Sequence, residues 1–174
     1  MPVHSRAEGF STHHRRLLAM CNELEAVADS LPNNVDRQKC LRLARALGPL
    51  LMEAQKLEEG EIFPALLTLD PSQVGLGGTL NQLRFDHQLD LCYAEEVQDM
   101  LRSYGEGRRN VSPDAAGFML RGFFEGLRRH IAFEEHMLVP LIQLVDSSPA
   151  RPAPFNRRGF RASRGPAPRC AGCW

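Results

Sequence analysis

The feature that most constrains this chain is an internal repeat that aligns without gaps. The segment EEGEIFPALLTLD at residues 58–70 matches EEHMLVPLIQLVD at residues 134–146. The segments that precede them match more loosely, with His14 over His87. Two copies of one helical hairpin, packed face to face, form a bundle around a pseudo-twofold axis. Residues near that axis are expected to occur in symmetric pairs.

Apolar residues recur at helical spacing in four long segments, which are separated by Gly- and Pro-containing turns. The predicted helices cover residues 11–30, 35–69, 79–104 and 113–145. The sequence has no convincing alternating pattern of the kind that predicts strands. It therefore predicts an all-α protein, an antiparallel up-down four-helix bundle.

The composition changes near residue 147, where Pro, Gly, Arg and Ser become frequent. We expect an N-terminal extension over 1–10, the bundle over 11–147, and a disordered tail over 148–174. The formal net charge is zero, but the tail carries six arginines and no acid, so the rest of the chain is acidic. The arginines could contact nucleic acid, a membrane or the acidic bundle. Few aromatic residues lie among them, which favours a solubilising tail, and we predict no nucleic-acid partner.

The cysteines indicate a reducing compartment. Their count is odd and their spacing matches no disulfide framework: Cys21, Cys40, Cys92, Cys170 and Cys173. Cys21 and Cys92 are predicted to be small core residues, and the single C-x-x-C at 170–173 is weak evidence for any function.

No signal peptide is visible, and no run of about 18 apolar residues predicts a membrane span. A cytoplasmic location is the expectation.

Polar side chains fall on the apolar faces of all four predicted helices. His130 and Glu134 are four residues apart, so they lie one turn apart on one face. His14, Glu58 and His87 occupy the inner faces of the other three helices. A buried carboxylate without a partner is costly, whereas one metal ion satisfies both imidazole nitrogens and carboxylate oxygens. The sequence therefore predicts a metal site formed by these five residues.

Each of these residues also has a simpler interpretation. A single histidine on an apolar face is more often packed and hydrogen-bonded than a ligand, and a glutamate at the end of an apolar run usually reaches solvent. Five inner polar positions at repeated spacing are harder to explain as separate packing events. The joint pattern is what favours a metal site.

At these residues the sequence resembles the hemerythrin-like family, whose domains are also called HHE cation-binding domains. That family carries one His on its first and third helices, and H-x-x-x-E followed by an apolar-Pro segment on its second and fourth. The matching segments here are THHRRLL, LRFDHQLDL and HIAFEEHMLVPLI. The resemblance covers about residues 10–146 and is moderately specific, because each motif is short but their order and spacing are distinctive.

The resemblance implies a nonheme iron centre, in which carboxylates bridge two irons. In that reading His14, His87 and His130 are terminal ligands, and Glu58 and Glu134 bridge or chelate the metals. Family members carry or sense dioxygen, handle nitric oxide, or sense iron. The expected partner is therefore a small diatomic ligand, and binding or sensing is expected rather than catalysis, with no catalytic residue predicted.

The second helix departs from the family pattern, because Ala54 stands where the family has a histidine. The loss could leave an open coordination position, a weaker second metal or a mononuclear site. Glu61 or water could compensate. The neighbours Glu59 and Glu135 are expected to point sideways.

Two other functions remain open. A degenerate, metal-free bundle that acts as a regulatory or interaction module is the alternative that Ala54 favours. A ferritin-like diiron oxidase or peroxide-consuming enzyme ranks last, because it normally uses more carboxylates than this sequence places in the core.

Overall fold

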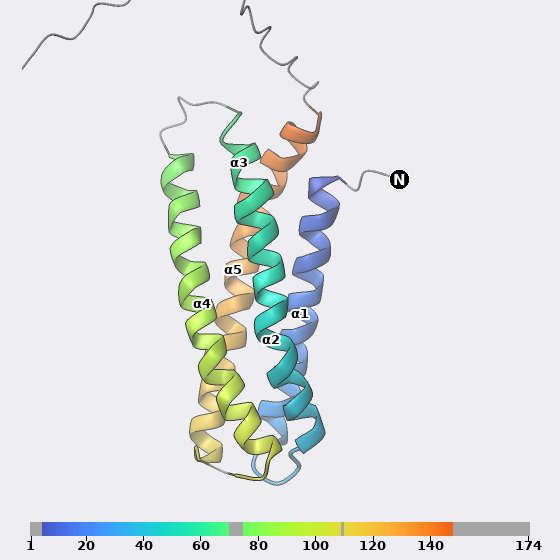
Figure 1. The fold of residues 1–174 in the computed structure, drawn as a ribbon, viewed down its shortest axis with the longest axis vertical. Coiled ribbons are helices and arrows are strands. Elements are labelled where there is room, and N and C mark those ends of the chain that lie inside the picture. Colours follow the sequence, from blue (N-terminus) through green and yellow to red (C-terminus); the bar gives the residue numbers. More distant parts are fainter. Residues whose placement is uncertain (1–4, 70–74, 109, 148–174) are drawn as a thin grey trace, which may run out of the picture.

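The computed structural model describes residues 5–69, 75–108 and 110–147. Within these residues the chain forms helices and no strand, and four long rods run the length of the molecule (Figure 1). This confirms the predicted helical bundle. The expected tail over 148–174 and most of the expected extension lie outside the described residues. The elements are α1 (Arg6–Ser30), α2 (Arg37–Leu57), η1 (Glu58–Ile62), α3 (Phe63–Leu66), α4 (Leu76–Gly105) and α5 (Pro113–Ser147).

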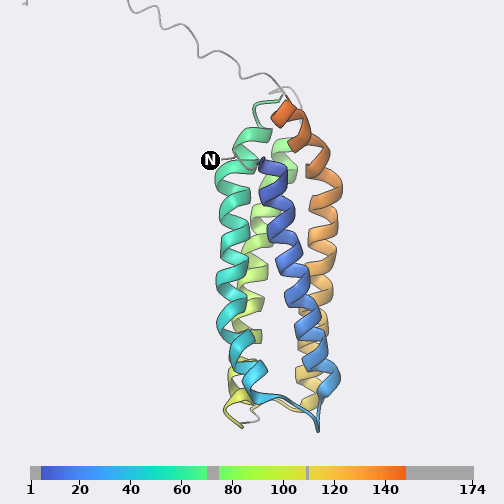
Figure 2. The ribbon, with the colours of Figure 1, turned by 90° about the vertical axis from the view of Figure 1, so that its right-hand side faces the viewer.

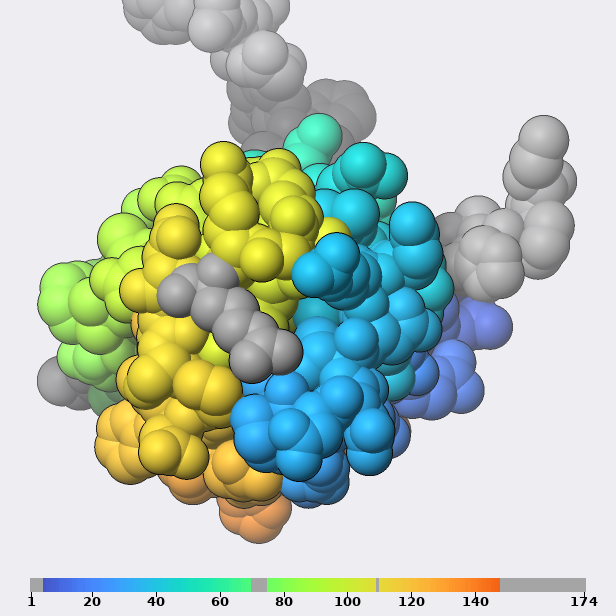
Figure 3. Space-filling view, turned by 90° about the horizontal axis from the view of Figure 1, so that it is seen from below, coloured from blue at the N-terminus to red at the C-terminus, as the bar shows by residue number. Residues whose placement is uncertain are grey.

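The rods alternate in direction, so that α1 and α4 run one way and α2 and α5 run the other (Figures 1 and 2). Helix α1 packs along α5, and α2 packs along α4. At the lower end of the bundle, the connection from α1 to α2 lies next to the ends of α4 and α5 (Figure 3). This is the arrangement that the internal repeat predicts, with two hairpins packed against each other. No helix among the described residues is long and apolar enough to cross a membrane.

Helix α1 begins earlier than the apolar pattern alone indicates. The side chain of Ser5 accepts a hydrogen bond from the Glu8 backbone N–H at 3.2 Å and caps the helix. Phe10 is fully buried, so the first turns already contribute to the core. The predicted start at residue 11 was therefore too late by five residues.

The second rod is a helix with a change of hydrogen-bonding pattern, rather than the single helix predicted over 35–69. Its middle part, η1, is a π-helical turn in which the Phe63 N–H bonds to the carbonyl of Glu58. Pro64 has no N–H to donate, and Gly60 stands where the second copy of the repeat has a histidine. The wider turn therefore lies in the segment that carries Glu58.

The apolar core is divided into two clusters. The larger one lies toward the lower end of the bundle around Leu24, Leu47 and Leu120, and the smaller one lies toward the upper end around Phe10 and Phe63. A layer of buried histidines and glutamates separates them. The predicted polar residues therefore lie at one level of the bundle.

The structure confirms one of the two cysteine predictions and contradicts the other. Cys21 is buried, as predicted, but Cys92 is exposed. Cys92 lies five residues after the inner residue His87, and five residues turn an α-helix through about 140°. It therefore points away from the core, and its prediction as a core residue was wrong.

Candidate metal centre

The structure brings together all five residues that the sequence singled out. His14 lies on α1, Glu58 at the start of η1, His87 on α4, and His130 and Glu134 on α5. His14 is fully buried, and Glu58, His87 and Glu134 are each only 2% exposed. The side chain of His130 is 11% exposed and lies at the edge of the cluster. Two carboxylates and three imidazoles thus lie together in the interior of the bundle.

The carboxylate of Glu58 lies between two imidazoles from different helices. Its Oε1 is 3.3 Å from Nε2 of His14, and its Oε2 is 3.2 Å from Nε2 of His87. Each oxygen therefore faces a different histidine, which is the arrangement of a carboxylate that can bridge two cations.

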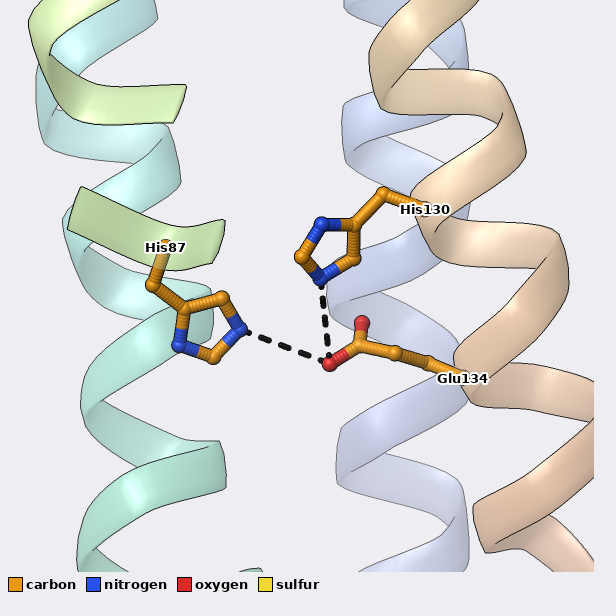
Figure 4. Close-up of side chains that lie close together, drawn as sticks. All are labelled: His87, His130 and Glu134. Atoms are coloured by element: carbon orange, nitrogen blue, oxygen red, sulfur yellow. Dashed lines mark hydrogen bonds and ion pairs between the residues drawn. The ribbon is translucent and has the colours of Figure 1, made fainter. Parts of the chain in front are cut away.

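Glu134 repeats this arrangement from the opposite side. Its Oε2 is 3.2 Å from Nε2 of His14. Its Oε1 is 3.4 Å from Nε2 of both His87 and His130, and these two rings point toward it (Figure 4). Two groups of potential ligand atoms result, each with all atoms within 4.8 Å of one another: His14, Glu58 and Glu134, and His87, His130 and Glu134.

The inner distances are long for charge-assisted hydrogen bonds and suit shared ligation of a cation. Charge-assisted N–H···O bonds are about 2.7–2.9 Å long, whereas ligands held about 2 Å from one ion lie about 3–4 Å apart. The nitrogen–oxygen distances between the inner residues are 3.2–3.4 Å. The donor set of imidazoles and carboxylates therefore fits metal cations at this place.

Each of the three imidazoles has a further carboxylate on its other ring nitrogen. Nδ1 of His87 lies 2.7 Å from Glu59, and Nδ1 of His130 lies 3.0 Å from Asp90. Nδ1 of His14 is 3.4 Å from an oxygen of the half-buried Glu135. A carboxylate in this position fixes the tautomer and orientation of a ligating histidine and raises its basicity.

These outer carboxylates were not predicted. Glu59 and Glu135 were expected to point sideways, which was wrong, and no role was predicted for Asp90. The signal in the sequence was their adjacency: Glu59 and Glu135 directly follow the two inner glutamates, and Asp90 is three residues after His87. Glu61 is exposed, so it does not compensate for Ala54.

The carboxylates favour the protonated imidazoles in the metal-free protein. Burial on its own lowers the pKa of His14, but hydrogen bonds to Glu134 and Glu58 outweigh it and raise the pKa to about 9. The same balance raises the pKa of His87 and of His130 to about 10. Burial raises the pKa of Glu134, but hydrogen bonds from the three histidines hold it well below its usual range. The site thus attracts positive charge, which protons supply when no cation is bound.

Ala54 is only 1% exposed and lies beside the cluster. It borders a cavity of about 10 Å³ that also touches Glu58, His87, His130 and Glu134. That volume is about the space that one water molecule needs. At this position the second rod therefore contributes only a small apolar side chain beside a small cavity.

Antiparallel helices with buried histidines and glutamates at one level define a class of proteins, the helical bundles that hold metal cations in their cores. The hemerythrin HHE cation-binding domain matches residues 6–142. The chain therefore belongs to the hemerythrin HHE cation-binding domain family, as the sequence motifs indicated. No curated protein and no solved structure matches the chain.

Proposed function

We propose that this chain is a nonheme iron-binding protein that binds or senses dioxygen, nitric oxide or iron itself. Membership of the family and the buried cluster of histidines and glutamates support a metal-binding role. Imidazole and carboxylate ligands suit iron, manganese and zinc. Iron is preferred because of the family, and a centre with two ions is preferred over one with a single ion.

The observation that carries this proposal is that two buried carboxylates each contact histidines from two different helices. Glu58 and Glu134 each place one oxygen against His14 and the other against His87. The partners that the structure gives these two buried carboxylates are all histidines. A cation on each side of the carboxylate pair would satisfy all of these groups at once.

The surrounding residues have distinct tasks in this proposal. Iron would supply a coordination position and a redox-active centre for a diatomic ligand. Glu59, Asp90 and Glu135 would hold the Nδ1 protons and keep each Nε2 free to ligate. The apolar clusters above and below would exclude water from the site. The predictions of a cytoplasmic location and of binding or sensing rather than catalysis remain part of the proposal.

The direct test is elemental analysis of protein purified from iron-supplemented cells, expressed as iron per chain. We expect about two iron ions, or one if the side next to Ala54 stays empty, and a ligand-to-metal charge-transfer band in the absorption spectrum. A Glu58→Ala variant should lose the band, and a Glu53→Ala variant, changed at an exposed residue of the same rod, should keep it. Wild-type protein that remains colourless and iron-free after anaerobic loading with Fe²⁺ contradicts the proposal.

The second candidate is a metal-free bundle that acts as a regulatory or interaction module, and the buried Ala54 favours it. The two functions differ in the effect of a chelator. A metal centre stabilises the folded state by mass action, so chelation lowers the melting temperature. A module without metal melts at the same temperature with and without the chelator.

A further inference from the structure

The pseudo-twofold relation predicted from the repeat extends to individual atoms of the site. The repeat pairs Glu58 with Glu134 and His14 with His87. Oε2 of Glu134 is 3.2 Å from His14, and its counterpart, Oε2 of Glu58, is 3.2 Å from His87. The remaining oxygens, Oε1 of Glu58 and Oε1 of Glu134, are 3.3 and 3.4 Å from the same two rings. The two halves of the inner site are therefore nearly equal.

The relation also holds for the outer carboxylates of these two histidines. His14 has Glu135 at its Nδ1, and His87 has Glu59, the counterpart of Glu135 in the repeat. A helical hairpin in each half thus supplies one histidine and receives one glutamate from the other half.

The relation fails at two linked positions. His130 and Asp90 form a contact of 3.0 Å in one half. Their counterparts in the other half are Ala54 and Leu17, since Asp90 follows His87 by three residues and Leu17 follows His14 by three. Ala54 is 1% exposed and Leu17 is 3% exposed. A ligand and the carboxylate that orients it are both absent, and two apolar side chains fill their places.

The cavity beside Ala54 lies across the pseudo-twofold axis. Except for His87, its lining residues form pairs across that axis: Leu17 with Asp90, Leu51 with Leu127, Ala54 with His130, Gln55 with Ile131, and Glu58 with Glu134. The two sides of this small cavity match at Leu51 with Leu127 and at Glu58 with Glu134, and they differ in polarity at the other three pairs. The two positions at which the relation fails, Leu17 with Asp90 and Ala54 with His130, both border this cavity.

Both replacements, Ala54 and Leu17, should weaken cation binding in the same half of the site, the half around His14. The half around His14 offers one imidazole and two shared carboxylates, and the half around His87 offers two imidazoles and the same carboxylates. A histidine at position 54 alone would lack an acceptor for its Nδ1 proton, because Leu17 has none. Loss of such an orienting partner typically costs about 10–100-fold in metal affinity.

We propose that the two cation positions are unequal and that Leu17 and Ala54 set this difference together. The ion held with His87 and His130 binds tightly, and the ion held with His14 binds weakly and exchanges on its own. The inference rests on the proposed metal-binding function, which it deepens by assigning an order of loading. Leu17 acts through the orientation of a ligand and not as a ligand itself.

The test is titration of the metal-free full-length chain with Co²⁺, whose visible spectrum responds to each ion bound. We expect one tight ion and a second ion that binds at least about tenfold more weakly. Three variants form a double-mutant cycle: Ala54→His, Leu17→Asn and the two combined. Asparagine has nearly the shape of leucine and supplies a neutral acceptor, so a buried charge is avoided.

The expected result is coupling between the two substitutions. Ala54→His should raise the affinity for the second ion modestly, and Leu17→Asn alone should not raise it. The combined variant should raise this affinity by more than the sum of the two separate effects. The converse variant, Asp90→Leu with His130→Ala, should remove the tight ion and leave two weak ones. Melting temperatures of the metal-free proteins show whether each variant folds, and the converse variant introduces no buried polar group.

Different results of this titration contradict different claims. A wild-type chain that binds no Co²⁺ contradicts the proposed function and this inference with it. Two ions of equal affinity overturn this inference alone, because metal binding is then shown. A single Ala54→His variant that already matches the combined variant overturns the role of Leu17.

Discussion

Nδ1 of His87 lies 2.7 Å from Oε1 of Glu59, a residue from the π-helical turn of a different rod. The contact ties the orientation of an inner histidine to the conformation of that turn. Glu58, directly before Glu59 in the chain, faces Nε2 of the same ring at 3.2 Å. Two adjacent glutamates thus hold one imidazole from both of its nitrogens. A π-helical turn inside an α-helical rod often marks a functional site, and here it carries both contacts.

Substitution of Glu59 tests the importance of this outer contact. Glu59→Gln keeps an acceptor but removes its charge, so it should lower the affinity for a divalent cation by about 10–100-fold. The measurement is competition with a chelator of known affinity. Glu61→Gln is the matched control, because Glu61 lies in the same turn and is exposed. Equal affinities for the two variants would contradict a positioning role for Glu59.

Removal of an inner carboxylate should destabilise the metal-free protein as well. Glu134 is 2% exposed and lies within 3.4 Å of His14, His87 and His130. Glu134→Ala leaves three buried imidazoles without this partner, and breaking a buried ion pair costs about 3–5 kcal/mol. Urea unfolding measures the free energy of unfolding. The control is Glu53→Ala, which removes an exposed pair with Arg16 and should cost about 1 kcal/mol or less.

The sequence was sufficient to predict which polar side chains gather in the core, because helical phase decides which residues face it. His14, His87 and Glu134 each occur within an apolar series at helical spacing, and each is buried. The repeat added the pairing of halves, and with it the level at which the residues meet. Helical phase can be read within one segment, and the pairing can be read by comparing two segments of the sequence.

For the outer carboxylates the sequence carried only adjacency to the inner residues, and their contacts also depend on how the rods pack. Glu59 and Glu135 stand one residue off the inner phase, and they reach a histidine only because of how the rods are rotated and staggered. Glu61 was expected as a residue that could compensate for Ala54, but the π-helical turn changes the rotation per residue, and Glu61 is exposed. The role that we propose for Leu17 follows only from the contact between its counterpart Asp90 and His130.

The stability of the metal-free protein should depend on pH in a defined direction. The pKa values of His14, His87 and His130 are raised from 6.5 to about 9–10, so their contribution is complete below pH 6.5 and is lost as the pH rises toward 10. The lowered pKa of Glu134 acts oppositely, and its contribution is lost as the pH falls below 4.5.

Stability should therefore be greatest between about pH 5 and 6.5. Circular dichroism melts of chelator-treated protein should show a loss of roughly 5 °C or more by pH 10, since 1 kcal/mol corresponds to about 2–4 °C at this size. His14→Gln should flatten the profile, and the exposed His136→Gln should leave it unchanged. A wild-type profile that stays level from pH 6.5 to 10 contradicts the raised pKa values.

Metal binding should release protons at neutral pH. With pKa values of about 9–10, the three imidazoles are protonated at pH 7 in the metal-free site, but a ligating nitrogen must be neutral. Each proton released makes the apparent affinity rise by up to about tenfold per pH unit, until the pH reaches the pKa of that imidazole. Calorimetric titration with Zn²⁺ in buffers of different ionisation enthalpy counts these protons directly. His130→Ala should release fewer protons than the wild type, because one ligand is lost, whereas His136→Gln should release the same number. A heat of binding that does not depend on the buffer would mean that the imidazoles are already neutral, and that cations enter the site without competition from protons.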